Sequence, residues 1–248
     1  MHPYLIHSGH LLIPTFGVLA ALGLMAALSL SLRTASFANL DPEKLWNAGL
    51  FTILSAFVLS RALLVLTNLH NFLTYPILLL MVPSLSPTGI LLTIIATLLY
   101  LRVHKLPLLP TLDAWAPCAT LIWLFLAVGH FAEGSDAGLP TTLPWGLPIP
   151  PDAARLHPAA LYAALAAALL TLVLLRQLRR RPRPGNLFAS ACAATGLVQF
   201  LLTFVRQPYP YLNPASHLLD PIQFISLGMI VTGGLLFLWP RKPVSHAL

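Results

Sequence analysis

Three polar side chains recur at intervals of three residues near the middle of the chain: His130, Glu133 and Asp136. At the end of a helix this spacing would bring all three to one face. A histidine beside a carboxylate can act as a general acid–base pair. The same residue types bind zinc, but no second ligand pair of known spacing accompanies them. We therefore expect either an acid–base pair of His130 and Glu133, with no metal or other cofactor, or a solvated polar edge.

Two arginines are candidates for binding an anion. Arg61 lies within the apolar stretch LSAFVLSRALLVL, where a cation is costly and by default marks a functional site or an internal ion pair. A guanidinium binds phosphate through paired hydrogen bonds, so Arg61 either holds a phospholipid phosphate, snorkels to the interface or pairs with a carbonyl. Arg206 either binds a phosphate, closes a pocket with Asp220, or anchors the chain beside Tyr209 and Tyr211.

The chain around these residues is unusually apolar, with 57% hydrophobic and 8% charged residues in a total of 248. A soluble domain carries about 25% charged residues, so we expect an all-α integral membrane protein with one polytopic domain over residues 1–248. The net charge of +7 does not indicate nucleic-acid binding, because five arginines lie in one short loop, as is typical of a cytoplasmic membrane loop. They are Arg176, Arg179, Arg180, Arg181 and Arg183.

A membrane-spanning helix needs about 20 mainly apolar residues, and seven stretches approach this length. They are Leu11–Leu32, Gly49–Thr67, Pro87–Val103, Trp115–Phe131, His157–Gln177, Leu187–Val205 and Pro221–Trp239. Phe72–Leu85 is also apolar, but Pro76 and Pro83 interrupt it, so we expect a re-entrant or interfacial segment. His157-Pro158 fits the start of the fifth span, with proline at its first position.

With seven spans the loops alternate between the two sides of the membrane. One side collects eleven of the fourteen basic residues, whereas the other holds only Arg155 and Arg206. The positive-inside rule then predicts an external N-terminus and a cytoplasmic C-terminus. The polar insert at about 129–156 lies on the outer side in this topology. Gln199, a polar group within the sixth span, is expected to bond a neighbouring helix.

Four blocks of sequence carry a family resemblance. The first is residues 129–145, GHFAEGSDAGLPTTLPW, which follow the pattern G-N-F-I-N-G-E-x-x-G-x-P-T-x-L-P-W at positions such as Gly134 and Gly138. The others are His157-Pro158 with Leu161-Tyr162 (H-P-x-x-L-Y), Phe200 to Pro208 with Arg206 (R-F-x-x-E-x-x-R-x-P), and Gln223 to Ser226 (G-Q-x-x-S). In this order the blocks resemble bacterial prolipoprotein diacylglyceryl transferase. The resemblance extends from about residue 49 onward and is weak over residues 1–48.

The resemblance implies a transferase of the bacterial inner membrane with its site on the periplasmic side. Such an enzyme moves the diacylglyceryl group of phosphatidylglycerol onto the lipobox cysteine of a prolipoprotein, and glycerol phosphate leaves. The reaction needs a base for the thiol, here His130 or Glu133, a cationic grip on the phosphate and a lateral path for lipid. Phosphatidylglycerol and a prolipoprotein signal peptide are the expected partners. The expected substrate-binding residues are Arg206, Arg61, His157, Tyr162, Gln199, Gln223, Gly134 and Gly138.

Most charged positions of the family pattern are replaced. The replacements are Ala127 for arginine, His130 and Glu133 for asparagines, Ser135 for glutamate, Thr195 for tyrosine, Gln199 for arginine, Thr203 for glutamate, and Pro87-Thr88-Gly89 at the H-G-G motif. Two hypotheses follow: a diverged transferase, or a catalytically inactive paralogue that binds lipid or serves as a structural subunit of a membrane complex. The first predicts that His130, Glu133 and Arg206 converge on one outer cavity open to lipid.

Overall fold

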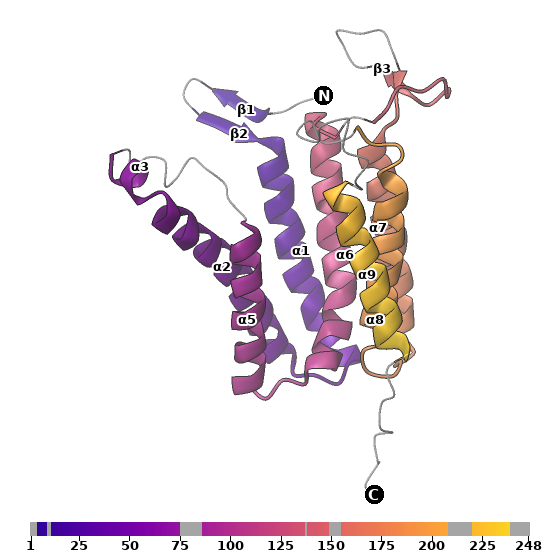
Figure 1. Ribbon diagram of the computed structural model, residues 1–248. Coiled ribbons are helices and arrows are strands. Elements are labelled where there is room, and N and C mark those ends of the chain that lie inside the picture. Colours follow the sequence, from indigo (N-terminus) through magenta and orange to yellow (C-terminus); the bar gives the residue numbers. More distant parts are fainter. Residues whose placement is uncertain are drawn as a thin grey trace, which may run out of the picture.

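The computed structural model describes residues 4–8, 11–74, 86–136, 138–148, 155–207 and 220–238 (Figure 1). The helices in these ranges are α1 (Thr15–Phe37), α2 (Pro42–Thr67), α3 (Leu69–Thr74), α5 (Pro87–Val103), α6 (Leu108–Glu133), α7 (Ala159–Arg179), α8 (Asn186–Leu202) and α9 (Pro221–Leu238). Two antiparallel strand pairs accompany them: β1 (Tyr4–Ser8) with β2 (Leu11–Pro14), and β3 (Leu147–Pro148) with β4 (Arg155–Leu156).

Five of the described helices are long and apolar enough to cross a membrane: α1, α2, α6, α7 and α9. The apolar helices α5 and α8 have 17 residues each, or about 26 Å at 1.5 Å per residue. That length is at the lower end of what spans the hydrocarbon core of a bilayer. The protein is therefore a multi-pass, all-α membrane protein, as the composition predicts. Each of the seven predicted spans coincides with a helix, but a count of seven crossings stays a prediction.

Several predicted boundaries are wrong. The first span does not begin at Leu11, because Leu11–Pro14 pairs with β1 and α1 begins only after Pro14. The fifth does not begin at His157, because the backbone of His157 bonds to a neighbouring loop and α7 begins at Ala159. The sixth ends at Leu202 rather than Val205. Of the predicted re-entrant segment, residues 72–74 belong to α3 and the rest lies outside the described residues.

The helices form a central group with one pair on each side of it (Figure 1). In the centre, α6 packs between α1 and α7. On one side α2 pairs with α5, and on the other α8 pairs with α9. Glycines permit the closest approaches: a Cβ at Gly233 of α9 would lie 2.6 Å from the carbonyl oxygen of Ala189 in α8. Small residues serve the same purpose in many membrane helix pairs, because they allow backbones to pack directly.

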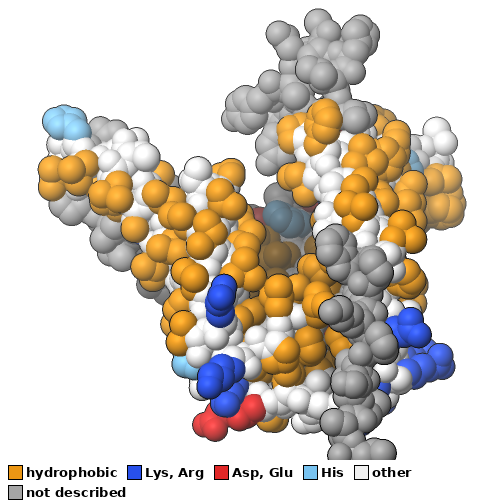
Figure 2. Space-filling view, turned by 60° about the horizontal axis from the view of Figure 1, so that its bottom comes forward, with side chains coloured by type: hydrophobic (Ala, Val, Ile, Leu, Met, Phe, Trp, Pro, Cys, Tyr) orange, Lys and Arg blue, Asp and Glu red, His pale blue; other side chains and the backbone are white. Residues whose placement is uncertain are grey.

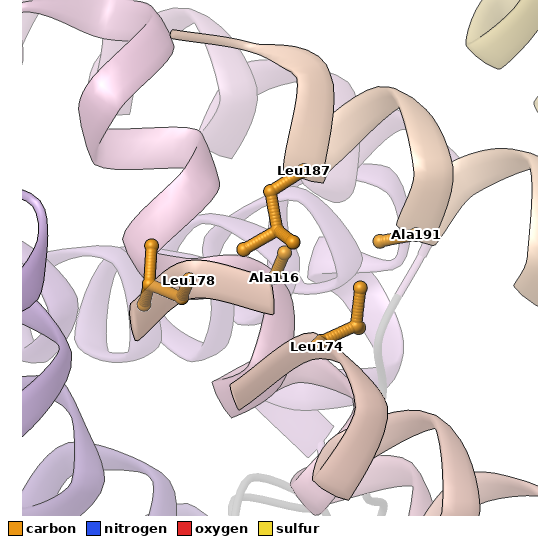
Figure 3. Packing of buried hydrophobic residues seen from close by; sticks show 5 residues of the cluster. All are labelled: Ala116, Leu174, Leu178, Leu187 and Ala191. Atoms are coloured by element: carbon orange, nitrogen blue, oxygen red, sulfur yellow. The ribbon is translucent and has the colours of Figure 1, made fainter. Parts of the chain in front are cut away.

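A small cluster of aliphatic side chains joins three of these helices. Figure 3 shows Ala116 of α6, Leu174 and Leu178 of α7, and Leu187 and Ala191 of α8 converging on one another. All five are buried, and Leu187 is only 1% exposed. The cluster fixes the start of α8 against the end of α7, next to the arginine-rich loop between them.

The outer flanks of the bundle are apolar. Figure 2 shows hydrophobic side chains along the helices, Lys and Arg side chains toward the end that faces the viewer, and a hollow between the α2–α5 pair and α9. Side chains such as Leu169 of α7, Leu235 of α9 and Val103 of α5 are 62% exposed or more. Such a surface is expected where lipid, rather than water, surrounds a protein.

Candidate active site at the end of α6

The end of α6 is shaped by a glycine in the left-handed region. Gly134 has φ 78°, and its N–H donates to the carbonyl oxygen of His130 at 2.9 Å. The N–H of Ser135 reaches the same oxygen at 3.2 Å. A residue with a Cβ would be strained in this conformation, so glycine is favoured at the turn. In the described structure Gly134 thus positions the polar residues on both sides of it.

His130 lies in the last turn of α6, and its side chain faces the start of α1. Its Nδ1 is 2.8 Å from Ser135 Oγ, and its ring packs on Phe16 with 4.6 Å between the ring centroids. Glu133 is half-buried and makes no hydrogen bond or ion pair with a described residue. The two proposed members of the acid–base pair are therefore not bonded to each other. His130 instead bonds a serine that occupies a family glutamate position.

Arg206 is held by two side chains on the same end of the bundle. Its Nη2 lies 2.9 Å from Asp136 Oδ2, and its Nη1 donates to Gln199 Oε1 at 3.3 Å. Arg206 and Asp136 are only 17% and 21% exposed. The buried Nε of Arg206 has no hydrogen-bond partner among the described residues. The buried Nε–H of the guanidinium is therefore unmatched among the described residues, in a largely enclosed position.

An ion pair with Asp220, one of the alternatives for Arg206, and the expected partner of Gln199 are not found among the described contacts. Arg206 pairs with Asp136 rather than with Asp220, whose Oδ1 accepts from the Ile222 N–H in the first turn of α9. Gln199 does not bond a neighbouring helix, because Arg206, which follows the end of α8, reaches back to it. The first difference arises because the turn after Gly134 brings the carboxylate of Asp136 to the arginine.

Gly138 occupies a narrow space between two backbones. Its N–H donates to the His157 carbonyl oxygen at 3.0 Å, and the next N–H, from Leu139, donates to Val205 at 2.8 Å. A Cβ on Gly138 would collide with the His157 oxygen and lie 2.7 Å from the Val205 oxygen. The segment thus runs as a middle strand between the chain before α7 and the chain after α8. It carries Arg206 into place beside Asp136.

The other matching residues support this layer. Tyr162 Oη accepts a hydrogen bond from Trp145 Nε1 at 2.8 Å and lies 3.4 Å from His157 Nδ1. Gln223 Nε2 donates to Thr203 Oγ1 at 3.0 Å, which ties the start of α9 to the end of α8. In the described structure these contacts hold loops and helix ends together. Substrate contact by them stays a prediction.

Arg61 belongs to a different part of the bundle. It is half-buried on α2, whereas Arg206 follows α8 on the opposite side of the central helices (Figure 1). The adjacent Ser60 is fully buried, and a Cβ on Gly89 of α5 would collide with its hydroxyl. Gly89 therefore allows α2 and α5 to pack closely. It stands at the position that the sequence analysis compared with the H-G-G motif. The two candidate phosphate-binding arginines are therefore not brought together.

One residue that the sequence analysis did not single out is Asp113, at the opposite end of α6. It is 4% exposed, and its carboxylate accepts hydrogen bonds from the backbone N–H groups of Gly185 and Phe188 at the start of α8. A carboxylate inside a membrane segment is itself a signal of function or pairing. The predicted span began only at Trp115, so the sequence analysis treated Asp113 as a loop residue, and only the start of α6 at Leu108 brings it into the helix. Among the described residues, no group of three His, Cys, Asp or Glu side chains could hold a metal ion.

Fold and site together define a polytopic helical membrane protein with a polar cluster built from loops at one end of the bundle. The chain belongs to the prolipoprotein diacylglyceryl transferase family, whose model matches residues 3–239. This match includes most of residues 1–48, over which the resemblance in the sequence is weak. The family resemblance is therefore confirmed over nearly the whole chain.

Individual relatives carry the name phosphatidylglycerol–prolipoprotein diacylglyceryl transferase. The protein of Clostridium tetani is 26% identical over 246 residues, which cover 96% of this chain and 97% of the relative. That of Geobacter sulfurreducens is 29% identical over 239 residues, with 93% and 92% covered. That of Paracidovorax citrulli is 32% identical over 165 residues, and the match spans only 61% of its length.

Proposed function

We propose that this protein is a diverged diacylglyceryl transferase that acts on phosphatidylglycerol in the outer leaflet of the bacterial inner membrane. The acceptor is the thiol of a lipobox cysteine or a related group. The new bond joins the acceptor sulfur to the terminal glyceryl carbon, the bond from that carbon to the phosphate oxygen breaks, and glycerol phosphate leaves with the electron pair. The thiol proton passes to a base on the protein.

The observation that carries this proposal is the state of Arg206. It is the arginine of the matching R-x-P block, it is largely enclosed, and its buried Nε has no partner among the described residues. A buried donor without an acceptor is costly, and an oxygen of a bound phosphate diester would satisfy it. A cation at this point would also stabilise the negative charge that develops on the leaving phosphate.

His130 is the better candidate for the base. Its Nδ1 is bonded to Ser135, which leaves Nε2 for proton transfer, and the ring is held against Phe16. Glu133 is one helical turn away and has no partner among the described residues, so it is the alternative. The turn that holds His130 also holds Asp136, the ion-pair partner of Arg206. The proposed base, His130, and the proposed phosphate-binding residue, Arg206, are therefore linked through the turn that holds Ser135 and Asp136.

The distribution of basic residues supports an outward-facing site. In the predicted topology, eleven of the fourteen basic residues lie on the side of the membrane opposite to the end of α6 that carries His130. The positive-inside rule then assigns the site to the periplasmic side.

A second function is favoured by the charge balance around Arg206. Asp136 neutralises its guanidinium, and Ala127, Gln199 and Thr203 replace charged family residues. A site with this balance binds a lipid without carrying out the transfer. In that case the protein is an inactive paralogue that binds phospholipid or supports a membrane complex.

The test is an assay of the full chain in nanodiscs that contain phosphatidylglycerol, with a lipobox peptide as acceptor. Peptide mass and released glycerol phosphate are read together, and a family member of known activity serves as the positive control. We expect a diacylglyceryl mass shift whose rate falls by about 10²–10⁴ in His130→Ala, the usual range for a lost acid–base group. Arg206→Gln should fall at least as far.

The matched control is His104→Ala, which removes an exposed histidine at the other end of the bundle. Its rate should equal that of the unaltered protein. If the unaltered protein gives no mass shift while the positive control is active, transfer to a lipobox peptide is excluded. Retention of phosphatidylglycerol by that inactive protein, lost in Arg206→Gln, would then support the second function.

A further inference from the structure

Positive charge is concentrated in residues 176–185, the last turn of α7 and its link to α8, which we call the arginine-rich connection. This connection holds Arg176, Arg179, Arg180, Arg181 and Arg183 within eight residues. The first two lie in the last turn of α7, where the helix dipole favours cations. The last three lie beyond the helix end, so the dipole does not account for them. All five are exposed, and none makes an ion pair with a residue that the structure describes.

The depth of these arginines follows from the length of α7. Its 21 residues extend for about 31 Å, close to the roughly 30 Å hydrocarbon core of a bilayer. The other end of α7 follows His157, which bonds to the Gly138–Leu139 segment of the candidate active site. The arginine-rich connection is therefore at the level of the lipid headgroups in the opposite leaflet.

A small pocket of about 70 Å³ opens beside the connection. The chain turns sharply here, because Arg181 has φ 50° and is followed by Pro182. Arg181 lines the pocket together with the apolar side chains of Phe37 from α1 and Leu178 from α7. Arg179 lies over the Phe37 ring, 5.5 Å from its centroid. The pocket thus combines a cation with an apolar wall.

The connection is also held in one conformation. Asp113 lines the pocket too, but both of its oxygens accept hydrogen bonds from backbone N–H groups, those of Gly185 and Phe188. The carboxylate therefore anchors the far end of the connection to α6 and is itself satisfied by the start of α8. The exposed arginines project from a fixed backbone, which lowers the entropic cost of binding a ligand.

We propose that this connection binds the headgroup of an anionic phospholipid in the leaflet opposite to the candidate active site. The phosphate diester is held by Arg181 and its neighbouring arginines, and the glycerol end of the lipid packs on the half-buried Phe37. Guanidinium groups bind phosphate oxygens in pairs, and basic clusters at membrane helix ends attract anionic lipids. This site is independent of the proposed transferase function, because it lies at the other end of α7.

The experiment measures lipid retention by the full chain in a mild detergent, using native mass spectrometry with added cardiolipin or phosphatidylcholine. The test variant is Arg181→Gln combined with Arg183→Gln, two exposed positions whose change should leave the fold intact. The matched control is Arg102→Gln with Lys105→Gln, which removes two exposed charges near the end of α5 at the same end of the bundle. A third variant, Arg206→Gln, reports on lipid that is held at the candidate active site instead.

We expect the unaltered protein to retain cardiolipin in preference to phosphatidylcholine. Two arginines near a membrane surface contribute enough that the test variant should bind cardiolipin about 30-fold more weakly. The α5 control should retain it as the unaltered protein does. The proposal is overturned if the unaltered protein shows no preference for the anionic lipid, or if the α5 control loses as much binding as the test variant. Loss only in Arg206→Gln would assign the bound lipid to the candidate active site and would also overturn it.

Discussion

Arg206 and Asp136 form an ion pair of 2.9 Å between the turn after α6 and the chain after α8. Both side chains are about four-fifths buried, so water screens the pair only partly. The same arginine donates to Gln199 and keeps an unmatched Nε. The ion pair therefore holds the two loops together, and it lowers the net positive charge available to a ligand at Arg206.

The first prediction is a coupling between these two residues. In a double-mutant cycle of Asp136→Asn and Arg206→Gln, we expect a coupling free energy of about 1 kcal/mol in thermal unfolding, because each single change leaves a partly buried charge unpaired. Asp136→Asn alone should strengthen retention of phosphatidylglycerol, because it frees the guanidinium charge. Additive effects of the two changes would contradict the pairing.

The second prediction concerns Gly138. Alanine at this position should destabilise the protein by about 2–4 kcal/mol, because its methyl group meets backbone oxygens of His157 and Val205 that cannot move aside. The measurement is the unfolding midpoint in detergent. Gly228→Ala is the matched control, since a Cβ there meets nothing within 4 Å. Equal midpoints for the two variants would show that the strand layer yields to Gly138→Ala.

The third prediction concerns the buried carboxylate of Asp113. Asp113→Asn should cost about 2 kcal/mol, because an amide replaces one of the two acceptors that satisfy N–H groups at the start of α8. Asp41→Asn is the control: the exposed Asp41 caps the start of α2 through Oδ1 alone, and asparagine keeps that acceptor, so the change should cost no more than a few tenths of a kcal/mol, by about the measure of ordinary cap exchanges. Unfolding midpoints of the two variants distinguish a buried anchor from an ordinary cap.

The fourth prediction tests the contact between α2 and α5. Gly89→Ala should lower the unfolding midpoint, because the new methyl group collides with Ser60. Combining it with Ser60→Gly removes the colliding hydroxyl and Cβ, so the double variant should recover part of the loss. A double variant that is less stable than Gly89→Ala alone would contradict the close contact.

The sequence predicted the helices well, because an apolar stretch of spanning length has few alternatives in a membrane. Pro87–Val103 was predicted to the residue, and the end of α2 at Thr67 was also correct. The start of α1 was missed because Leu11–Pro14 is equally suited to a strand. Pairing with residues 4–8, a tertiary contact, decided the outcome.

The sequence singled out candidate site residues but not their contacts, and the functional roles of these residues stay predictions. The spacing of His130, Glu133 and Asp136 suggested one shared face, yet the left-handed turn at Gly134 ends the helix between the second and third. Asp136 is thereby directed to Arg206, a residue far along the chain. Periodicity describes neighbours within a helix, and it holds no information on which distant loop an aspartate meets.

The hollow between the α2–α5 pair and α9 has a consequence for how the protein is handled (Figure 2). Each helix pair is fastened to the central helices, but α5 and α9 bound an open space between them. In a bilayer we expect acyl chains to fill that space, because exposed side chains of α5 and α9 such as Leu91 and Leu235 are apolar. When those lipids are stripped, the described contacts between the two pairs run through the central helices, so we expect the spacing of the pairs in a purified sample to depend on the extraction detergent.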